Sequence, residues 1–205
     1  MPRARSQVKS RRELYSEATR SALLEAATEL FATRGFLKTS LEDVAAAAHV
    51  TRGAVYHHFA GKQALFEAVL DAQERRADTE ILATATSEDP WEAATQALSA
   101  FLDKSCDPVY GRLMWLEGPT AMGWHRWREF EQQHAFGLVT GFVEALMDAG
   151  YLERQAVDST VKFAFWMLGG AGLAVAEAPD MDKAQVRDEW AELLRRAMSG
   201  LRKEP

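Results

Sequence analysis

Hydrogen-bonding groups suited to an anionic polymer are concentrated in the segment TRGAVYHHF, residues 51–59. On a helical wheel, Val55 marks the buried edge of this segment, whereas Gly53 and His57 lie opposite and Tyr56 lies to one side. Glycine costs up to ~1 kcal/mol relative to alanine inside a helix, so Gly53 needs a compensating reason. The close approach of a phosphate backbone to the helix would provide one.

The polar side chains of this segment could make two kinds of contact with duplex DNA. Tyr56 and His58 can donate hydrogen bonds to phosphate oxygens. Thr51, Arg52 and His57, in the N-terminal half of the helix, can reach base edges in a major groove. The segment therefore has the chemistry of a groove-reading helix.

Other interpretations of the same residues are open. Gly53 could be a tolerated weak position, and the aromatic rings could be partly packed surface residues. The adjacent His57 and His58 could suggest a metal, but consecutive residues point to different sides of a helix, and no third ligand stands nearby at a zinc-like spacing. We therefore predict no metal site.

The charge distribution supports a polyanion partner for one part of the chain only. The formal net charge is −6, yet residues 1–62 hold ten Lys and Arg against six Asp and Glu, and the remaining residues hold 14 against 24. A basic head on an acidic body indicates that the head meets the polyanion. For the cations nearest the N-terminus, a solvated tail is an equally good explanation; these are Arg3, Arg5, Lys9, Arg11 and Arg12.

Apolar residues recur at helical spacing almost everywhere, which predicts an all-α fold. In the N-terminal part, a first helix is stopped by Gly35, a second opens at Ser40 with Asp43 as a capping-box variant, a third has Thr51 as its N-cap, and a fourth starts near Lys62. Only a tight turn fits between the second and third helices. This is the helix-turn-helix arrangement.

The C-terminal part is also helical, but its breaks are less regular. We expect the Pro- and Gly-containing segments 106–111 and 116–123 to bound one short helix. The other helices are predicted at residues 91–105, 124–149, 157–177 and 183–200.

Residues 23–70 closely resemble the DNA-binding head of the TetR family of bacterial transcriptional regulators. The resemblance rests on the AA..LF...G run at 26–35, on Thr39 with Ser40, and on TRGAVYHHFAGKQAL at 51–65. One departure is His49, where the family commonly has glycine in the turn, although histidine tolerates a positive φ better than most residues. The DNA contacts implied by the resemblance fall on Ser40, Thr51, Arg52, Gly53, Tyr56, His57, His58 and Lys62.

The resemblance implies an N-terminal three-helix helix-turn-helix head over residues 13–62 and a helical ligand-binding and dimerisation body over 63–205. Residues 163–176 are apolar on all sides, so we expect one face to pack on the body and the other on a second copy of the chain. A homodimer built this way would read a palindromic operator in successive major grooves. The predicted interface residues are Phe163, Trp166, Met167, Gly170, Leu173, Trp190, Leu194 and Met198.

Aromatic residues cluster in the middle of the body, where they could simply form its core or line a pocket for a small molecule. In the family, a ligand bound in the body releases the DNA, which implies a repressor controlled by a small hydrophobic or aromatic effector. The predicted pocket residues are Phe101, Met114, Trp115, Glu117, Trp124, Trp127, His134 and Trp166. A ligand-independent DNA-binding protein with a structural role is the alternative, and a filled body would favour it.

Several other classes of protein are disfavoured. Cys106 is the only cysteine, and neither a catalytic triad, a glycine-rich phosphate loop nor a metal-spaced cluster stands out, so we predict no enzyme and no cofactor. The longest uncharged apolar run, residues 163–176, is too short to span a bilayer, and the N-terminus lacks a signal-peptide core. We therefore expect a cytoplasmic protein without a membrane partner.

Overall fold

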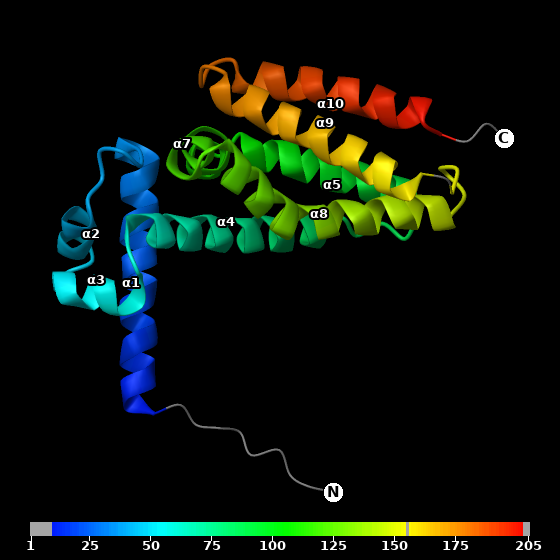
Figure 1. Ribbon diagram of the computed structural model, residues 1–205. Helices are drawn as coiled ribbons and strands as arrows, with labels where there is room; N and C mark the ends of the chain where they lie inside the picture. Colours follow the sequence, from blue (N-terminus) through cyan, green and yellow to red (C-terminus); the bar gives the residue numbers. More distant parts are fainter. Residues whose placement is uncertain (1–9, 155, 203–205) are drawn as a thin grey trace, which may run out of the picture. The chain divides into compact units, whose positions relative to one another are not determined.

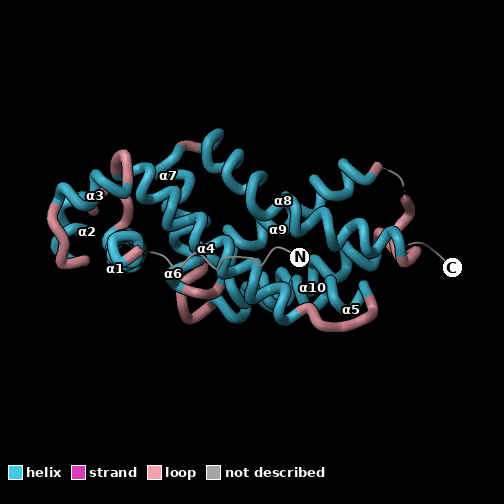
Figure 2. Tube along the Cα trace, turned by 90° about the horizontal axis from the view of Figure 1, so that it is seen from below, coloured by secondary structure: helices cyan, strands magenta, loops and turns pink. Residues whose placement is uncertain are grey.

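The structure is a computed structural model that describes residues 10–154 and 156–202. These residues form α-helices joined by short loops (Figures 1 and 2), which confirms the all-α prediction. The chain packs as two units that divide between Val69 and Leu70, inside α4 (Lys62–Thr84). The boundary that the sequence predicted, after residue 62, lies at the start of the same helix. The basic residues Arg3, Arg5 and Lys9 lie outside the described residues.

The head contains α1 (Arg11–Arg34), α2 (Leu41–Ala47), α3 (Arg52–His58) and the first turns of α4. Figure 1 shows α2 and α3 as short helices beside the long α1. As predicted, α1 ends at Gly35, which has a φ of 83° and whose N–H donates to the Phe31 carbonyl. Glycine suits this position because other residues are strained at positive φ.

Three phenylalanine rings organise the core of the head. Phe31 lies 5.1 Å from Phe66 and 5.8 Å from Phe36, and Phe36 lies 5.1 Å from Phe66, measured between ring centroids. Val44 of α2 and Val55 of α3 are fully buried in the same unit. Each of the short helices is therefore held by an apolar anchor, which compensates for their low intrinsic stability.

The body contains the rest of α4 and α5 (Pro90–Ser105), α6 (Pro108–Gly111), a π-helical segment η1 (Arg112–Glu117), α7 (Gly118–Met122), α8 (Trp124–Asp148), α9 (Val157–Glu177) and α10 (Lys183–Gly200). Helix α9 contacts α5, α8 and α10, and it also touches η1. Figure 1 shows α9 running between α8 and α10. This central position buries the side of α9 that carries Val161, Phe165 and Val175.

One prediction for the body was wrong. Segments 106–111 and 116–123 do not bound a short helix, because the chain is helical without interruption from Pro108 to Met122. Pro108 and Pro119 each lie in the first turn of a helical segment, where a missing N–H costs little.

The glycines of this continuous segment are explained by close packing. A Cβ at Gly111 would lie 2.5 Å from the Ser105 carbonyl oxygen, and one at Gly118 would lie 2.6 Å from the Trp127 ring. Glycine therefore marks close approach here, whereas the sequence suggested a break in the helix.

Helix α9 is, within the described part of the chain, the one helix long and apolar enough to cross a membrane by length and composition. The uncharged run at 163–176 forms part of this 21-residue helix. One third of its most apolar window is buried against the rest of the body. The same composition is typical of a central helix packed on several neighbours.

Candidate DNA-binding face and buried cavity

Helix α2 starts at a reciprocal capping box. The Ser40 hydroxyl donates to Asp43 Oδ2 over 2.6 Å and accepts from the Asp43 N–H over 3.1 Å, while the Ser40 N–H donates to the same carboxylate over 2.9 Å. The hydrogen bonds from Ser40 lower the pKa of the Asp43 carboxyl. The Ser40 hydroxyl proton is thus engaged inside the head.

The turn between α2 and α3 accommodates a histidine in the left-handed region. His49 has a φ of 55°, and the next N–H, that of Val50, donates to the Ala45 carbonyl over 2.9 Å. Histidine adopts this backbone conformation more readily than branched residues do. The turn therefore forms although glycine is missing.

Helix α3 presents the predicted polar face to the outside. Thr51 caps the helix by accepting from the Ala54 N–H over 3.2 Å. Gly53, Tyr56 and His57 are exposed, whereas Val55 is fully buried. A Cβ at Gly53 would meet only Thr51 Oγ1, at 3.8 Å, so nothing in the described chain requires glycine there.

Arg52 is held on the outer face by two neighbours. Its guanidinium pairs with Glu42 at 2.9 Å, donates to the Tyr56 hydroxyl over 3.4 Å, and lies 5.5 Å from the centre of the Tyr56 ring. These contacts connect α2 and α3. They also hold the guanidinium of Arg52 and the ring of Tyr56 in fixed positions on the helix that carries Gly53.

The adjacent histidines differ in environment. His57 is exposed, whereas His58 is half-buried. Their rings lie 5.1 Å apart. Burial, together with the neighbouring His57, lowers the pKa of His58. His58 therefore favours the neutral form, which can still donate one hydrogen bond.

Lys62 makes contacts that the sequence did not predict. Its ammonium donates to the carbonyl oxygens of Phe36 at 2.7 Å, Thr39 at 2.9 Å and Leu37 at 3.5 Å. The same ammonium lies 4.3 Å from the centre of the Phe36 ring. Through these hydrogen bonds, Lys62 connects the start of α4 to the loop that precedes α2. Its separation of more than twenty residues from these partners hid the contact from sequence patterns.

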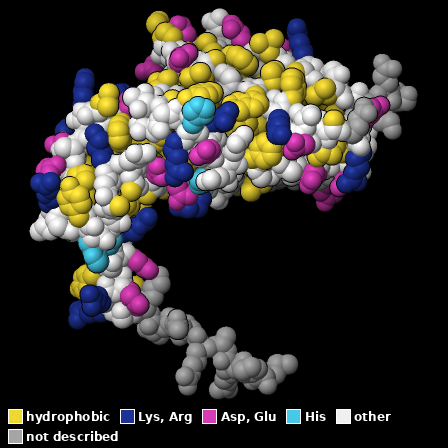
Figure 3. Space-filling view, in the orientation of Figure 1, with side chains coloured by type: hydrophobic (Ala, Val, Ile, Leu, Met, Phe, Trp, Pro, Cys, Tyr) yellow, Lys and Arg dark blue, Asp and Glu magenta, His cyan; other side chains and the backbone are white. Residues whose placement is uncertain are grey.

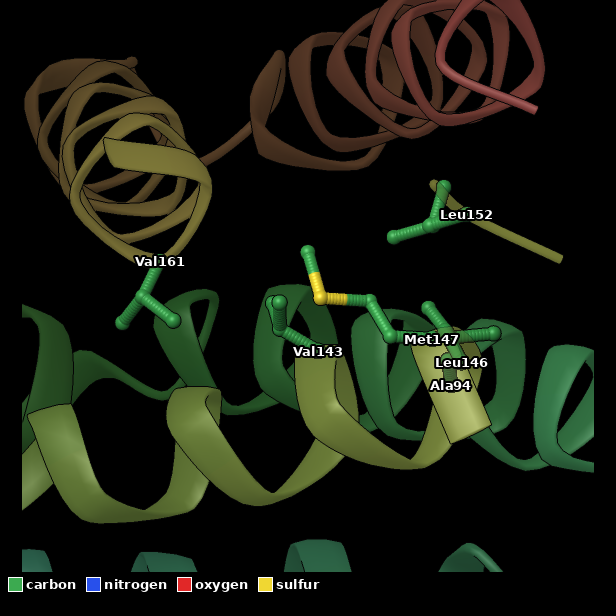
Figure 4. Close-up of a cluster of buried hydrophobic side chains, with 6 residues drawn as sticks. All are labelled: Ala94, Val143, Leu146, Met147, Leu152 and Val161. Carbon is green, nitrogen blue, oxygen red and sulfur yellow. The ribbon is translucent and has the colours of Figure 1, made fainter. Parts of the chain in front are cut away.

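The body contains a partly open cavity of about 180 Å³ with mainly apolar walls. Four of the predicted pocket residues line it: Phe101, Trp115, Trp127 and Trp166. Trp127 is fixed by a hydrogen bond from its indole N–H to the Met114 carbonyl, 2.9 Å long. Side chains from α5 and α8 and from the loop after α8 pack with Val161 of α9 in a buried apolar cluster (Figure 4). Cavity residues of that cluster are Ala94, Val143, Leu146 and Leu152.

Four predicted pocket residues lie elsewhere. Met114 is fully buried in the core, and Trp124 is 54% exposed. Glu117 Oε1 lies 3.6 Å from Arg112 Nη2. His134 places Nδ1 2.8 Å from the Phe130 carbonyl and Nε2 3.1 Å from Asp71. Of the three predicted pocket residues on α8, which are Trp124, Trp127 and His134, only Trp127 lines the cavity.

Acidic residues of the cavity wall were absent from the predicted pocket. Glu74 and Asp78 of α4 and Glu131 of α8 all line the cavity. Glu74 and Glu131 are buried, and the Tyr110 hydroxyl donates to Glu74 over 2.9 Å. Their spacing on amphipathic helices resembles that of ordinary surface carboxylates, so only the fold reveals them.

Gly172 of α9 makes room for one wall of the cavity. A Cβ at Gly172 would lie 2.4 Å from the Trp115 indole. The close approach expected for the GGAG segment at 169–172 is therefore made by a tryptophan of η1.

An apolar stripe on α9 is left uncovered. Phe163, Trp166 and Leu173 are 47%, 41% and 38% exposed, and Gly170 is exposed beside them. Figure 3 shows hydrophobic side chains gathered over the face of the body formed by α8 and α9. These four belong to the predicted interface.

The other predicted interface residues are more covered. Leu194 is only 5% exposed because it faces the core formed with α5 and α9, so it lies on the side of α10 that packs within the chain. Met167, Trp190 and Met198 are half-buried against the same core. Leu193 on α10 and Leu201, directly after the end of α10, are exposed instead.

Both parts of the chain match known protein families. Residues 23–69 match the family described as bacterial regulatory proteins, tetR family, and residues 91–201 match the tetracyclin repressor-like C-terminal domain. The helix-turn-helix head followed by a helical body defines a DNA-binding transcriptional regulator that is not an enzyme. The chain belongs to the TetR family.

Individual relatives agree with this assignment. The chain is 27% identical over 145 residues to the transposon Tn10 TetC protein of Escherichia coli, covering 71% of this chain and 73% of that one. It is 36% identical over 83 residues to the regulator SrpR of Pseudomonas putida, which covers 40% of this chain and 39% of SrpR. A crystal structure of a TetR-family regulator from Pectobacterium atrosepticum superposes with a TM-score of 0.81 at 26% identity, covering 96% of this chain and 100% of that one.

Proposed function

We propose that the protein is a repressor that binds a palindromic operator as a homodimer and releases it when a small hydrophobic or aromatic effector binds in the body. The observation that carries the proposal is the outer face of α3, where open space above Gly53 is bordered by exposed Arg52, Tyr56 and His57. This protein would act on double-stranded DNA in the cytoplasm and need no cofactor.

The contacts of α3 with DNA follow from its geometry. With no side chain at Gly53, the helix can approach the phosphate backbone closely. Arg52 must leave Glu42 to reach a base edge, but an exposed ion pair contributes only ~0–1 kcal/mol, so its release costs little. Thr51 and His57 would join Arg52 in the groove, as proposed from the sequence.

The remaining head residues divide between contact and support. Tyr56 and His58 can donate to phosphates. Ser40 and Lys62 have their polar hydrogens engaged inside the head, so we give them the role of fixing α2 and the start of α4. The charge of Lys62 still adds to the positive potential of this surface.

The uncovered stripe on α9 supports a homodimer. A contiguous apolar surface of this kind favours burial against another chain. A second copy, related by a two-fold axis, would place the same residues opposite themselves. Two heads would then read half-sites ~34–36 Å apart, or a multiple of that distance, along the DNA.

The cavity supports an effector over the ligand-independent alternative, which would have a filled body. An apolar cavity of ~150 Å³ can hold benzene, so a partly open cavity of about 180 Å³ has room for a molecule with an aromatic ring. Release of DNA requires the effector to bind the DNA-free state more tightly than the DNA-bound state.

Selection of genomic fragments by the purified full-length protein tests the proposal. We expect the bound fragments to share an inverted repeat, and their affinity to fall steeply with salt because Lys and Arg neutralise phosphates. A direct repeat or a single half-site would contradict the two-fold dimer. Fragments without a common sequence would contradict an operator-specific repressor.

A further inference from the structure

The cavity of the body contains a carboxyl group without a partner. Glu131 is 5% exposed and lines the cavity. Its Oε1 atom is buried and has no hydrogen-bond partner. Since an unsatisfied buried polar atom costs ~1–3 kcal/mol or more, an unpartnered carboxyl oxygen at a cavity wall points to a ligand that satisfies it.

A second carboxyl group accompanies it. Glu74, 3% exposed, lines the same cavity and accepts a hydrogen bond from Tyr110. Within the described residues, neither Glu74 nor Glu131 forms an ion pair with a lysine, arginine or histidine. A buried carboxyl group without a cation is unfavourable when it is ionised. These two positions therefore lower the stability of the protein unless a bound cation pairs with them.

The electrostatics of the pair agree with this view. Burial raises the pKa of Glu74 to about 7, against the opposing effect of the Tyr110 hydrogen bond. Burial, and then the neighbouring Glu74, raise the pKa of Glu131 well above its usual range. Burial also raises the pKa of Asp78 on α4. Near neutral pH, the carboxyl groups of the cavity therefore retain protons that an incoming cation would displace.

The charged and titratable groups around the pair come from three elements. Helix α4 contributes Asp78 beside Glu74, α6 contributes Tyr110, and α8 contributes His134, whose ring nitrogens are occupied by Asp71 and a backbone carbonyl. Within the described residues, none of these groups pairs with the Glu131 carboxyl, and Arg128, one turn earlier on α8, keeps a buried Nε without a hydrogen-bond partner.

We propose that the effector carries a protonated amine on an aromatic or aliphatic body, with the amine held by Glu131 and Glu74 and the apolar part lying along Trp115, Trp127 and Phe101. This proposal rests on the proposed function of the cavity and specifies the chemistry of its ligand. An ammonium can satisfy carboxylate oxygens with its three donors, and aromatic faces attract cations.

A metal ion is a poorer occupant than an amine. In the described part of the chain, no three His, Cys, Asp or Glu side chains are grouped so that they could hold a metal ion. The walls beyond the carboxyls are apolar and aromatic, and such walls match an organic cation.

Calorimetric titration of the full-length protein with three matched probes tests the proposal. The probes are 4-phenylbutylamine, 4-phenyl-1-butanol and 4-phenylbutyrate, which share the ring and chain and differ in the charge of the end group. We expect the amine to bind at least tenfold more tightly than the alcohol, and the acid to bind most weakly. Amine binding should release protons, measured by repeating the titration in buffers of different ionisation enthalpy.

Matched variants locate the effect. Glu131→Gln keeps the size of the side chain and should weaken amine binding at least tenfold while leaving alcohol binding unchanged. Glu74→Gln is a second variant should the first fold poorly. Glu144→Gln, on the exposed side of α8, controls for attraction of the amine to the acidic surface.

The outcomes distinguish failure of the amine proposal from failure of the proposed effector site. Equal binding of amine and alcohol, or tighter binding of the acid, overturns the proposed ligand class but leaves an effector cavity. If no probe binds, the amine proposal fails and the cavity also loses its support as an effector site, whereas operator selection by the protein alone still tests the DNA-binding function.

Discussion

Replacement of Gly53 by alanine separates a functional reason for glycine from a structural one. The backbone of Gly53 is helical, without a positive φ, and a Cβ there would meet only Thr51 Oγ1 at 3.8 Å. Alanine should therefore fit the free protein and favour the helix by ~0.5–1 kcal/mol. For a domain of the size of the head, that corresponds to a rise in the unfolding midpoint of roughly 2–8 °C.

Binding to the operator should change in the opposite direction. The added methyl group occupies the space through which α3 would approach the DNA backbone, so we expect operator affinity to fall tenfold or more, which is ~1.4 kcal/mol or more. Thermal unfolding measures the first effect, and fluorescence anisotropy with a selected operator fragment measures the second. A stabilised variant with weakened DNA binding is the combination that the structure predicts.

Gly137→Ala is the matched control. Gly137 is an exposed glycine inside α8, and nothing lies within 4 Å of a Cβ built there. It should gain the same helix propensity and bind the operator as tightly as the unmodified protein. If Gly53→Ala also bound the operator normally, close approach of DNA to this backbone would be refuted. If Gly53→Ala destabilised the head, the added methyl group would have to clash with the free protein, which would contradict the open space above Gly53.

Other positions give predictions for stability, each checked by chemical or thermal unfolding. Lys62→Met should destabilise the head by about 1–3 kcal/mol, because three carbonyl oxygens lose a charged donor; Lys38→Met, at an exposed site, should have little effect. Gly172→Ala should destabilise the body by about 1–3 kcal/mol through overpacking against an indole, whereas Gly170→Ala, with its nearest atom at 3.8 Å, should not. The folded state keeps a proton on Glu74 that the unfolded state loses near pH 4.5. The free energy of unfolding should therefore fall by roughly 3 kcal/mol as pH rises from 4.5 through about 7. Glu74→Gln should reduce this pH dependence, and a variant whose stability varied with pH as in the unmodified protein would contradict the prediction.

The parts of the fold that depend on local chemistry could be predicted from the sequence. The Ser40 and Thr51 caps and the glycine stop after α1 are determined by residues within four positions of each other. Such interactions need no tertiary partner, so their pattern is visible along the chain. The outward face of α3 was predictable for the same reason, since one buried residue, Val55, sets the orientation of the whole helix.

The parts that depend on distant partners could not be predicted. Glycine and proline within Pro108–Met122 indicated breaks in the sequence. The role of Gly111 and Gly118 in close packing depends on Ser105 and Trp127, which the pattern along the chain does not reveal. The buried pair Glu74 and Glu131 comes from two different helices, and the two residues are more than fifty positions apart in the sequence. A carboxylate on an amphipathic helix gives no sign in the sequence that a neighbouring helix covers it.

Helix α4 connects the two halves of the proposed mechanism in one continuous element. Its first part supplies Phe66 to the core of the head, and its later part supplies Glu74 and Asp78 to the cavity of the body. An amine bound at Glu74 changes the charge state of this helix, and it can weaken DNA binding only by the ratio of its affinities for the free and DNA-bound forms. By linkage, the operator must weaken amine binding by the same factor. A ligand held by apolar contacts alone would leave the carboxyls protonated, so proton release would then be uncoupled from the release of DNA.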